Sequence, residues 1–160
     1  MSANKFYTLL QAAASGVIAW LSAKLGILFP VMCLLLSAMV VDYITGMLAS
    51  KKEALEHPGD TGYGWSSKKG AAGIIKKVGY LCIIAVAMMI DYIIMHVASA
   101  AGIAINTQVF FGLLVAVWYL LNELLSIIEN AGRMGAPVPE WLTKYIAVLK
   151  NKIDTSTDQE

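Results

Sequence analysis

The chain has 160 residues, of which 58% are hydrophobic and only 14% are charged, whereas an ordinary soluble domain has roughly 45–50% apolar and about 25% charged residues. Such a composition excludes an ordinary soluble protein and predicts a single membrane domain over residues 1–160, too short to add a separate globular enzyme to an anchor. The formal net charge of +1 also excludes the bulk basic character that attracts nucleic acid, so we expect no nucleic-acid partner.

The first apolar segment, residues 6–23, is the weakest candidate for a membrane-spanning helix, because it contains one glutamine and two serines. A span needs about 20 predominantly apolar residues. Ser15, Ala19 and Ala23 recur every four positions, and this spacing of small residues lets another helix approach closely. We therefore expect a helix that packs against protein, and the sequence leaves open whether the chain has three or four spans.

The next span is predicted over residues 30–50, because Gly26 can end one helix and Pro30 is favourable in the first turn of another. This punctuation predicts a tight helical hairpin between the first two segments. Residues 51–73 then form a polar stretch with a proline and several glycines. Such a stretch cannot lie in hydrocarbon, so it is predicted to be a loop in water or at the headgroups.

Two further spans are predicted over residues 74–97 and 109–128, joined by an uncharged turn at 99–107. Prolines then end the helix, and apolar residues return at helical spacing over residues 140–153. This pattern predicts an amphipathic helix at the membrane surface, or equally a helix docked on a partner or another copy. The acidic residues 154–160 are predicted to be a disordered tail.

The lysines predict the orientation of the chain in the membrane. Six of the 12 basic residues lie between the second span and the first turn of the third, at positions 51, 52, 68, 69, 76 and 77. Because lysine and arginine in short loops stay on the cytoplasmic side, we expect the long loop and the C-terminus in the cytoplasm and the 99–107 turn outside.

Three carboxylic acids, Asp42, Asp91 and Glu123, fall within the predicted spans. Each costs about 2.5–3.5 kcal/mol there if it is ionised and unpaired. At about 1.5 Å per residue, Asp42 and Glu123 can share a level near the cytoplasmic side, whereas Asp91 belongs near the other surface. These groups either face a lumen, where protonation or voltage biases packing, or only fix helix register. In the second case, their candidate hydrogen-bond partners are Tyr43, Thr45 and Asn122.

Nothing in the sequence predicts an enzyme, a cofactor or a metal site. The two histidines are far apart, and Cys33 and Cys82 lie in apolar runs where we expect small core residues. Asp42 and Asp91 lie in consecutive spans, as in an intramembrane aspartyl protease, but their predicted depths differ. The glycine-containing stretch at 62–70 lacks the GxxxxGK[ST] pattern of a phosphate-binding loop.

Several short motifs in order carry a family resemblance. The run Asp42-Tyr43-Ile44-Thr45-Gly46 is followed by Ser66-Ser67-Lys68-Lys69-Gly70 and by Gly73-Ile74-Ile75-Lys76-Lys77. Asp91 and the run Gly135-Ala136-Pro137-Val138-Pro139 come next. Over roughly residues 40–153 this order and spacing resembles the phage lysis and toxin-secretion holin family. The 53–65 loop departs from the family because it is longer than the usual connection.

The resemblance implies a protein that accumulates in the bacterial cytoplasmic membrane, forms homo-oligomers and opens holes through which a cell-wall hydrolase (an endolysin) or a toxin leaves. An antiholin is a possible further partner. The family has no catalytic residues to transfer. The motif positions, together with the in-span Glu123, are candidates for assembly or gating: Asp42, Gly46, Lys68, Gly70, Gly73, Lys76, Asp91 and Glu123.

The main rival prediction is a small multi-span transporter or ion channel, because an intramembrane acid such as Glu123 can bind a cation or a proton. Transporters often contain internal repeats, and we find no convincing repeat between the two halves of this chain. A purely structural membrane scaffold is also possible. Release of cytosolic enzymes, rather than of small ions alone, would distinguish a hole former from these alternatives.

Overall fold

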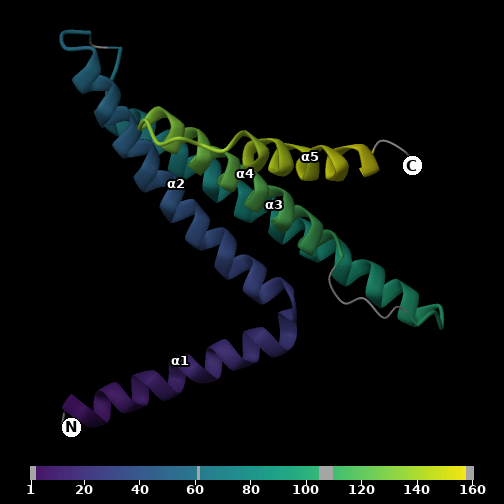
Figure 1. The fold of residues 1–160 in the computed structure, drawn as a ribbon. Coiled ribbons are helices and arrows are strands. Elements are labelled where there is room, and N and C mark those ends of the chain that lie inside the picture. Colours follow the sequence, from purple (N-terminus) through teal and green to yellow (C-terminus); the bar gives the residue numbers. More distant parts are fainter. Residues whose placement is uncertain (1–2, 61, 105–109, 158–160) are drawn as a thin grey trace.

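The structure is a computed structural model of the chain, and it describes residues 3–60, 62–104 and 110–157. In these ranges it contains helices and no strand (Figure 1). The helices are α1 (Ala3–Leu25), α2 (Leu28–Glu56), α3 (Ser67–Ala100), α4 (Phe111–Arg133) and α5 (Glu140–Thr157). By length and apolar composition α1 to α4 can each cross a bilayer. The chain is therefore an all-α membrane protein, as the sequence predicts.

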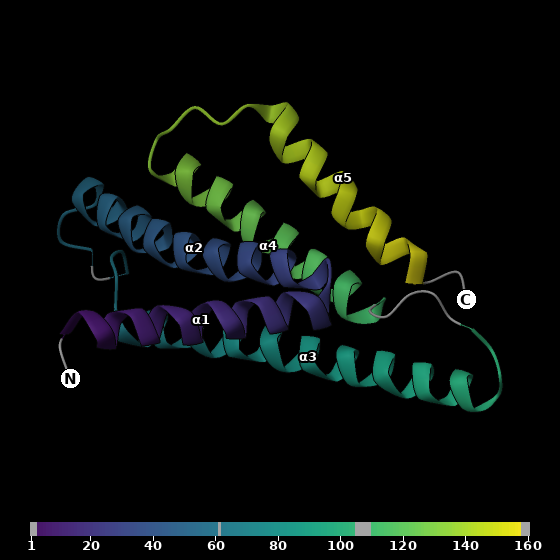
Figure 2. The ribbon, with the colours of Figure 1, turned by 90° about the horizontal axis from the view of Figure 1, so that it is seen from below.

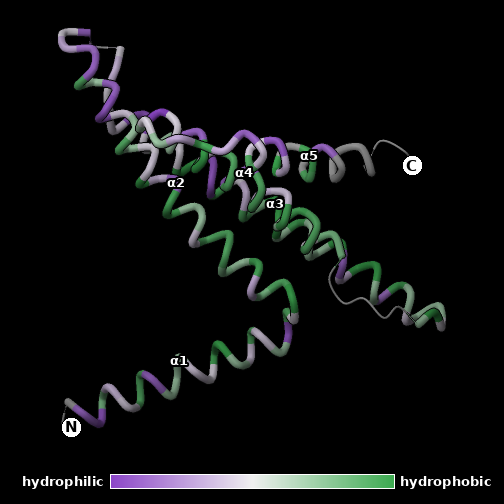
Figure 3. The backbone as a smooth tube through the Cα atoms, in the orientation of Figure 1, coloured by the Kyte–Doolittle hydropathy of each residue, from purple (hydrophilic) through white to green (hydrophobic). Residues whose placement is uncertain are grey.

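Helix α4 is the centre of the packing, since it contacts α2, α3 and α5, whereas α2 and α3 touch each other far less. The buried core lies where α2, α3 and α4 meet, and its members are Leu28, Leu35, Met39, Ile84, Ala116 and Tyr119. Figure 3 shows that apolar residues dominate the middle of these three helices and that polar residues gather toward the 57–66 connection and along α5. We call the end of the molecule with residues 57–66 and 134–139 the loop end. The opposite end, with Gly26 and Ala101, is the turn end.

The prediction of a tight hairpin between the first two helices is wrong, because the two helices do not pack side by side. Only Gly26 and Ile27 join α1 to α2, but the helices diverge into an open V in Figure 1, which is foreshortened in the view of Figure 2. Gly26 has a φ of +51°, a left-handed conformation that turns the chain sharply at a glycine. Residues 4–20 are all exposed. Within the described residues, α1 therefore packs against α2 and against no other helix.

The polar loop is shorter than the predicted 51–73, because the flanking helices continue into it. Helix α2 extends to Glu56, through lysine, glutamate, alanine and leucine, which are good helix formers. Helix α3 starts at Ser67, where the Ser66 side chain accepts a hydrogen bond from the backbone N–H of Lys69 at 3.2 Å and so caps the helix. With 34 residues, α3 is roughly 51 Å long, longer than the ~30 Å hydrocarbon layer.

The C-terminal helix α5 runs from Glu140 to Thr157, beyond the predicted 140–153, so residues 154–157 are helical and not part of a disordered tail. Residues 158–160 of that tail, and residues 105–109 of the predicted turn, lie outside the described residues. The amphipathic helix packs on α4 of its own chain. Ile146 is buried there, whereas Trp141 and Tyr145 are exposed.

Candidate functional site

Three helices bring oppositely charged side chains together inside the span. Lys77 of α3 lies with its Nζ 2.9 Å from Asp42 Oδ2 of α2, and it also pairs with Glu123 of α4. These side chains are little exposed, at 15%, 16% and 5% for Lys77, Asp42 and Glu123. We call Asp42, Lys77 and Glu123 the ion triad. With all three groups ionised it holds two negative charges and one positive charge.

The predicted level shared by Asp42 and Glu123 is confirmed by this common partner. Asp42 is 14 residues into α2 and Glu123 is 12 residues into α4, which places them roughly 21 Å and 18 Å from the turn end. The sequence interpretation missed Lys77 as the partner, because it treated Lys76 and Lys77 as residues at the edge of a loop. In the structure both lie in the third turn of α3.

A polar stripe on α4 continues the ion triad toward the loop end. Asn130 donates from Nδ2 to Asp42 Oδ1 at 3.0 Å and to Thr45 Oγ1 at 3.3 Å, and Arg133 donates from Nη1 to Asn130 Oδ1 at 2.9 Å. Sequence reasoning missed this stripe. Its signal is the spacing of Glu123, Ser126, Asn130 and Arg133, which places all four on one face of a helix.

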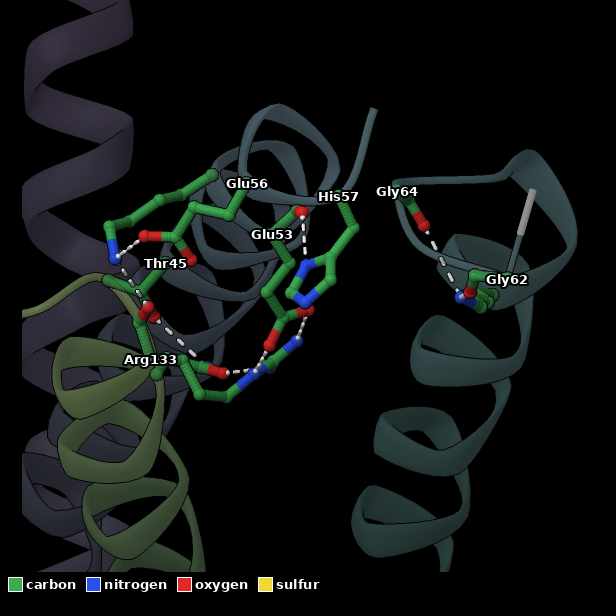
Figure 4. Close-up of polar contacts among 10 residues, drawn as sticks. Thr45, Glu53, Glu56, His57, Gly62, Gly64 and Arg133 are labelled. Carbon is green, nitrogen blue, oxygen red and sulfur yellow. Dashed lines mark hydrogen bonds and ion pairs between the residues drawn. The ribbon is translucent and has the colours of Figure 1, made fainter. Parts of the chain in front are cut away.

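At the loop end, Arg133 joins α4 to α2 through a two-pronged ion pair (Figure 4). Its Nε and Nη2 donate to Glu53 Oε1 and Oε2, both at 2.8 Å. Lys52 approaches the Arg133 carbonyl oxygen at 3.4 Å and pairs with Glu56 at 2.7 Å. Bidentate arginine–carboxylate pairs fix geometry as well as charge, so this contact holds the loop ends of α2 and α4 in register.

The 57–66 connection is folded around Lys69 of α3. The Lys69 ammonium donates to the carbonyl oxygens of Gly62 and Gly64, both at 3.3 Å (Figure 4, right). The rings of His57 and Tyr63 stack with their centroids 4.1 Å apart. The described residues of this loop therefore have local contacts of their own.

Gly70 gives the aromatic side chains around it room to pack. A Cβ at Gly70 would lie 3.0 Å from Tyr43 Oη and 3.2 Å from the Trp65 ring, whereas a Cβ at Gly73 meets no atom within 4 Å. We expect Gly73→Ala to raise helix stability by up to about 1 kcal/mol. Gly70→Ala should be less stable than Gly73→Ala, because Trp65 and Tyr43 must shift to make room for the methyl group. Thermal unfolding in detergent compares the two variants, and equal midpoints would show that the Gly70 contact does not matter.

Asp91 acts at the turn end, away from the ion triad, in agreement with its predicted depth. Its carboxylate accepts hydrogen bonds from the backbone N–H groups of Phe111 at 2.9 Å and Gly112 at 2.8 Å, and the residue is only 7% exposed. The first N–H groups of a helix have no partner within the helix. Asp91 of α3 therefore caps the start of α4 from a neighbouring helix.

Removal of this cap is expected to loosen the turn end without disturbing the ion triad. Asp91→Ala leaves the Phe111 and Gly112 N–H groups unpaired, and loss of a cap costs about 0.5–2 kcal/mol. Asp91→Asn keeps one acceptor and should lose less. Limited proteolysis between α3 and α4 measures the effect, and cleavage as slow in Asp91→Ala as in the unmodified chain would contradict the capping role.

A polar groove opens between α3 and α4 beside the ion triad. Its volume is about 650 Å³, and its polar lining includes Lys76, Asn122, Ser126 and Glu129 besides the triad itself. A second hollow of about 410 Å³ lies toward the loop end, against Glu53 and Arg133, and it shares Asp42 and Ser126 with the first. We call the first hollow the α3–α4 groove.

The other motif residues divide between this region and the surface. Gly73 and Lys76 line the α3–α4 groove, and the Lys76 ammonium lies 5.6 Å from the centre of the Tyr80 ring. A Cβ at Gly46 would lie 3.5 Å from Asn130 Nδ2. Lys68 is exposed at the start of α3. Cys33 and Cys82, expected in the core, are exposed as well.

In comparison with known proteins, the sequence profile of the bacteriophage holin family matches residues 19–151. The chain belongs to the bacteriophage holin family. The matched region contains the ion triad and the α3–α4 groove, whereas most of α1 precedes it. No solved structure matches the chain.

Relatives of this holin-family chain occur in Halalkalibacterium, Listeria and Clostridium. It is 39% identical over 117 residues to an uncharacterized protein of Halalkalibacterium halodurans, which covers 73% of this chain and 76% of the relative. It is 38% identical over 122 residues to an uncharacterized protein of Listeria innocua, covering 76% and 71%. An uncharacterized 14.9 kDa protein of Clostridium perfringens is 32% identical over 119 residues, covering 74% and 75%.

Proposed function

We propose that this chain is a holin that oligomerises in the bacterial cytoplasmic membrane and opens holes that release a cell-wall hydrolase or a toxin. The loop end, with residues 57–66 and the C-terminal helix α5, faces the cytoplasm, in line with the lysines around it. The α3–α4 groove carries this proposal, because it places charged side chains on the flank of an apolar bundle.

Contact between that groove and lipid acyl chains is unfavourable. Lys76 and Glu129 are exposed along its loop-end part, and the ion triad lies deeper in it. An ionised group at the centre of a span costs about 2.5–3.5 kcal/mol if it faces lipid unpaired. One copy cannot enclose the groove. Several copies arranged with their grooves inward would share a wetted lumen, as polar pore linings do in channels.

Helix α1 supports self-association independently. Its only contacts in the described chain are with α2, and its small residues Ser15, Ala19 and Ala23 are exposed. Rows of small residues let membrane helices pack closely. A neighbouring copy is therefore a suitable partner for this face of α1.

The hole would act on its cargo by size and needs no binding site for it. An endolysin or toxin is thus a functional partner, and an antiholin that shares the helix contacts would compete for assembly. In the described residues, a single copy contributes four candidate spanning helices, too few to surround a passage for a folded protein.

Induced expression in a bacterium, with and without a cytosolic cell-wall hydrolase, tests the proposal. We expect membrane potential to collapse abruptly after a delay and culture density to fall only when the hydrolase is present. Steady growth with full membrane insertion would contradict hole formation. Collapse of potential without any release of hydrolase would favour the small ion channel, which the in-span ion triad also suits.

A further inference from the structure

We propose that the α3–α4 groove is a water-filled crevice even before assembly, entered from the loop end and closed toward the turn end, and that this face becomes the wall of the hole. The proposal of a crevice is based on the geometry of one chain. Its role as the wall of the hole rests on the function proposed above.

The two hollows adjoin at Asp42 and Ser126, and together they extend from the loop end toward the middle of the span. The outer part touches Glu53 and Arg133, whose ion pair lies at the ends of α2 and α4. Glu123 lies 10 residues before Arg133 on α4, so the two hollows together reach roughly 15 Å into the bundle.

The lining of the α3–α4 groove favours water over lipid. Asn122, Ser126 and Glu129 of α4 face Gly73 and Lys76 of α3 across it, and these groups supply the several polar partners that a bound water needs. A volume of about 650 Å³ has room for on the order of 20 water molecules at about 30 Å³ each. Acyl chains in the same space would leave Lys76 and Glu129 without solvation.

Stacked tyrosines mark the closed end of the crevice. The rings of Tyr80 and Tyr119 lie 3.9 Å apart, and the Trp118 ring meets Tyr119 edge-on at 5.0 Å. Tyr119 is only 5% exposed and belongs to the apolar core that continues toward the turn end with Ile84 and Leu35. Water that enters from the loop end therefore stops beside the ion triad.

Cysteine labelling distinguishes access from the loop end from access from the turn end, and the groove from the outer surface of α3. In a Cys33→Ala, Cys82→Ala background, single cysteines are placed in the groove, as Asn122→Cys or Ser126→Cys. Ile75→Cys is the matched control, because Ile75 is 71% exposed on α3 one residue before Lys76 and does not line the groove. Ser67→Cys, at the exposed start of α3, marks the loop end.

The full chains are labelled in membrane vesicles of either orientation with a membrane-impermeant charged maleimide. We expect both groove cysteines to react from the side that labels Ser67→Cys, about tenfold or more faster than Ile75→Cys, because hydrocarbon suppresses the reactive thiolate. Rates equal to that of Ile75→Cys would overturn the crevice, as would labelling from the turn end.

The role as wall of the hole has its own readout. After assembly, a maleimide attached to a protein-sized dextran, which the hole admits and the crevice of one chain does not, should react with Ser126→Cys and not with Ile75→Cys. A Ser126→Cys side chain that stays unlabelled by this reagent while dextran leaves the vesicles would overturn that role. If the unmodified chain gave no efflux while the groove cysteines were still labelled, the proposed holin function would be refuted and the crevice would still be supported.

Discussion

Lys77→Met is expected to lower the free energy of unfolding by about 3–5 kcal/mol, the usual cost of removing one partner from a buried ion pair. Lys77 is the cation partner of both Asp42 and Glu123, and its side chain is 15% exposed. Without it two carboxylates face each other across the helices. Thermal unfolding in detergent and the amount of protein inserted in membranes measure the loss.

Two control variants separate the ion triad from a general effect of lost charge. Lys76→Met removes the neighbouring lysine, which is exposed, and should cost far less. Combining Lys77→Met with Asp42→Asn and Glu123→Gln removes every charge of the triad and should recover most of the stability, because neutral replacement of a whole buried network is often tolerated. A Lys77→Met protein as stable as Lys76→Met would contradict the structural importance of the triad.

Neutralising one acid of the triad is expected to delay hole opening. Asp42→Asn or Glu123→Gln leaves one carboxylate for Lys77 and removes an excess charge that costs up to about 2.5–3.5 kcal/mol in a span. The resting arrangement of α2, α3 and α4 then gains stability. The delay between induction and collapse of membrane potential, compared at equal protein levels, measures the change.

Asp91→Asn is the matched control for that delay, since it neutralises an in-span acid that contacts the start of α4 and not the triad. Its timing should change less than that of Asp42→Asn. Unchanged timing in Asp42→Asn at unchanged protein level would remove Asp42 from the trigger.

The sequence predicts the main features of the fold because apolar length is a strong signal in a membrane protein. All four spans appear as helices, and the 3.6-residue periodicity predicts α5. Helix ends were less predictable. Residues 51–56 are polar but good helix formers, so α2 continues past the apolar run to Glu56.

The candidate site was predictable only in part. Depth along the helices indicates that Asp42 and Glu123 can meet, but the rotation of α3 that presents Lys77 to both is a property of packing. The open V at Gly26 was not predictable either. A glycine permits many backbone conformations, so its position in the sequence does not set the angle between the two helices. The Asp91 cap was missed because its partners are backbone N–H groups, which leave no trace in side-chain patterns.

Release of size-graded fluorescent dextrans from lipid vesicles tests hole formation most directly. With the purified chain at rising density, we expect vesicles to stay sealed below a threshold and then to release dextrans as large as a folded hydrolase. Vesicles that remain sealed to every dextran at high density, or that leak only small ions, would contradict the proposed holin function.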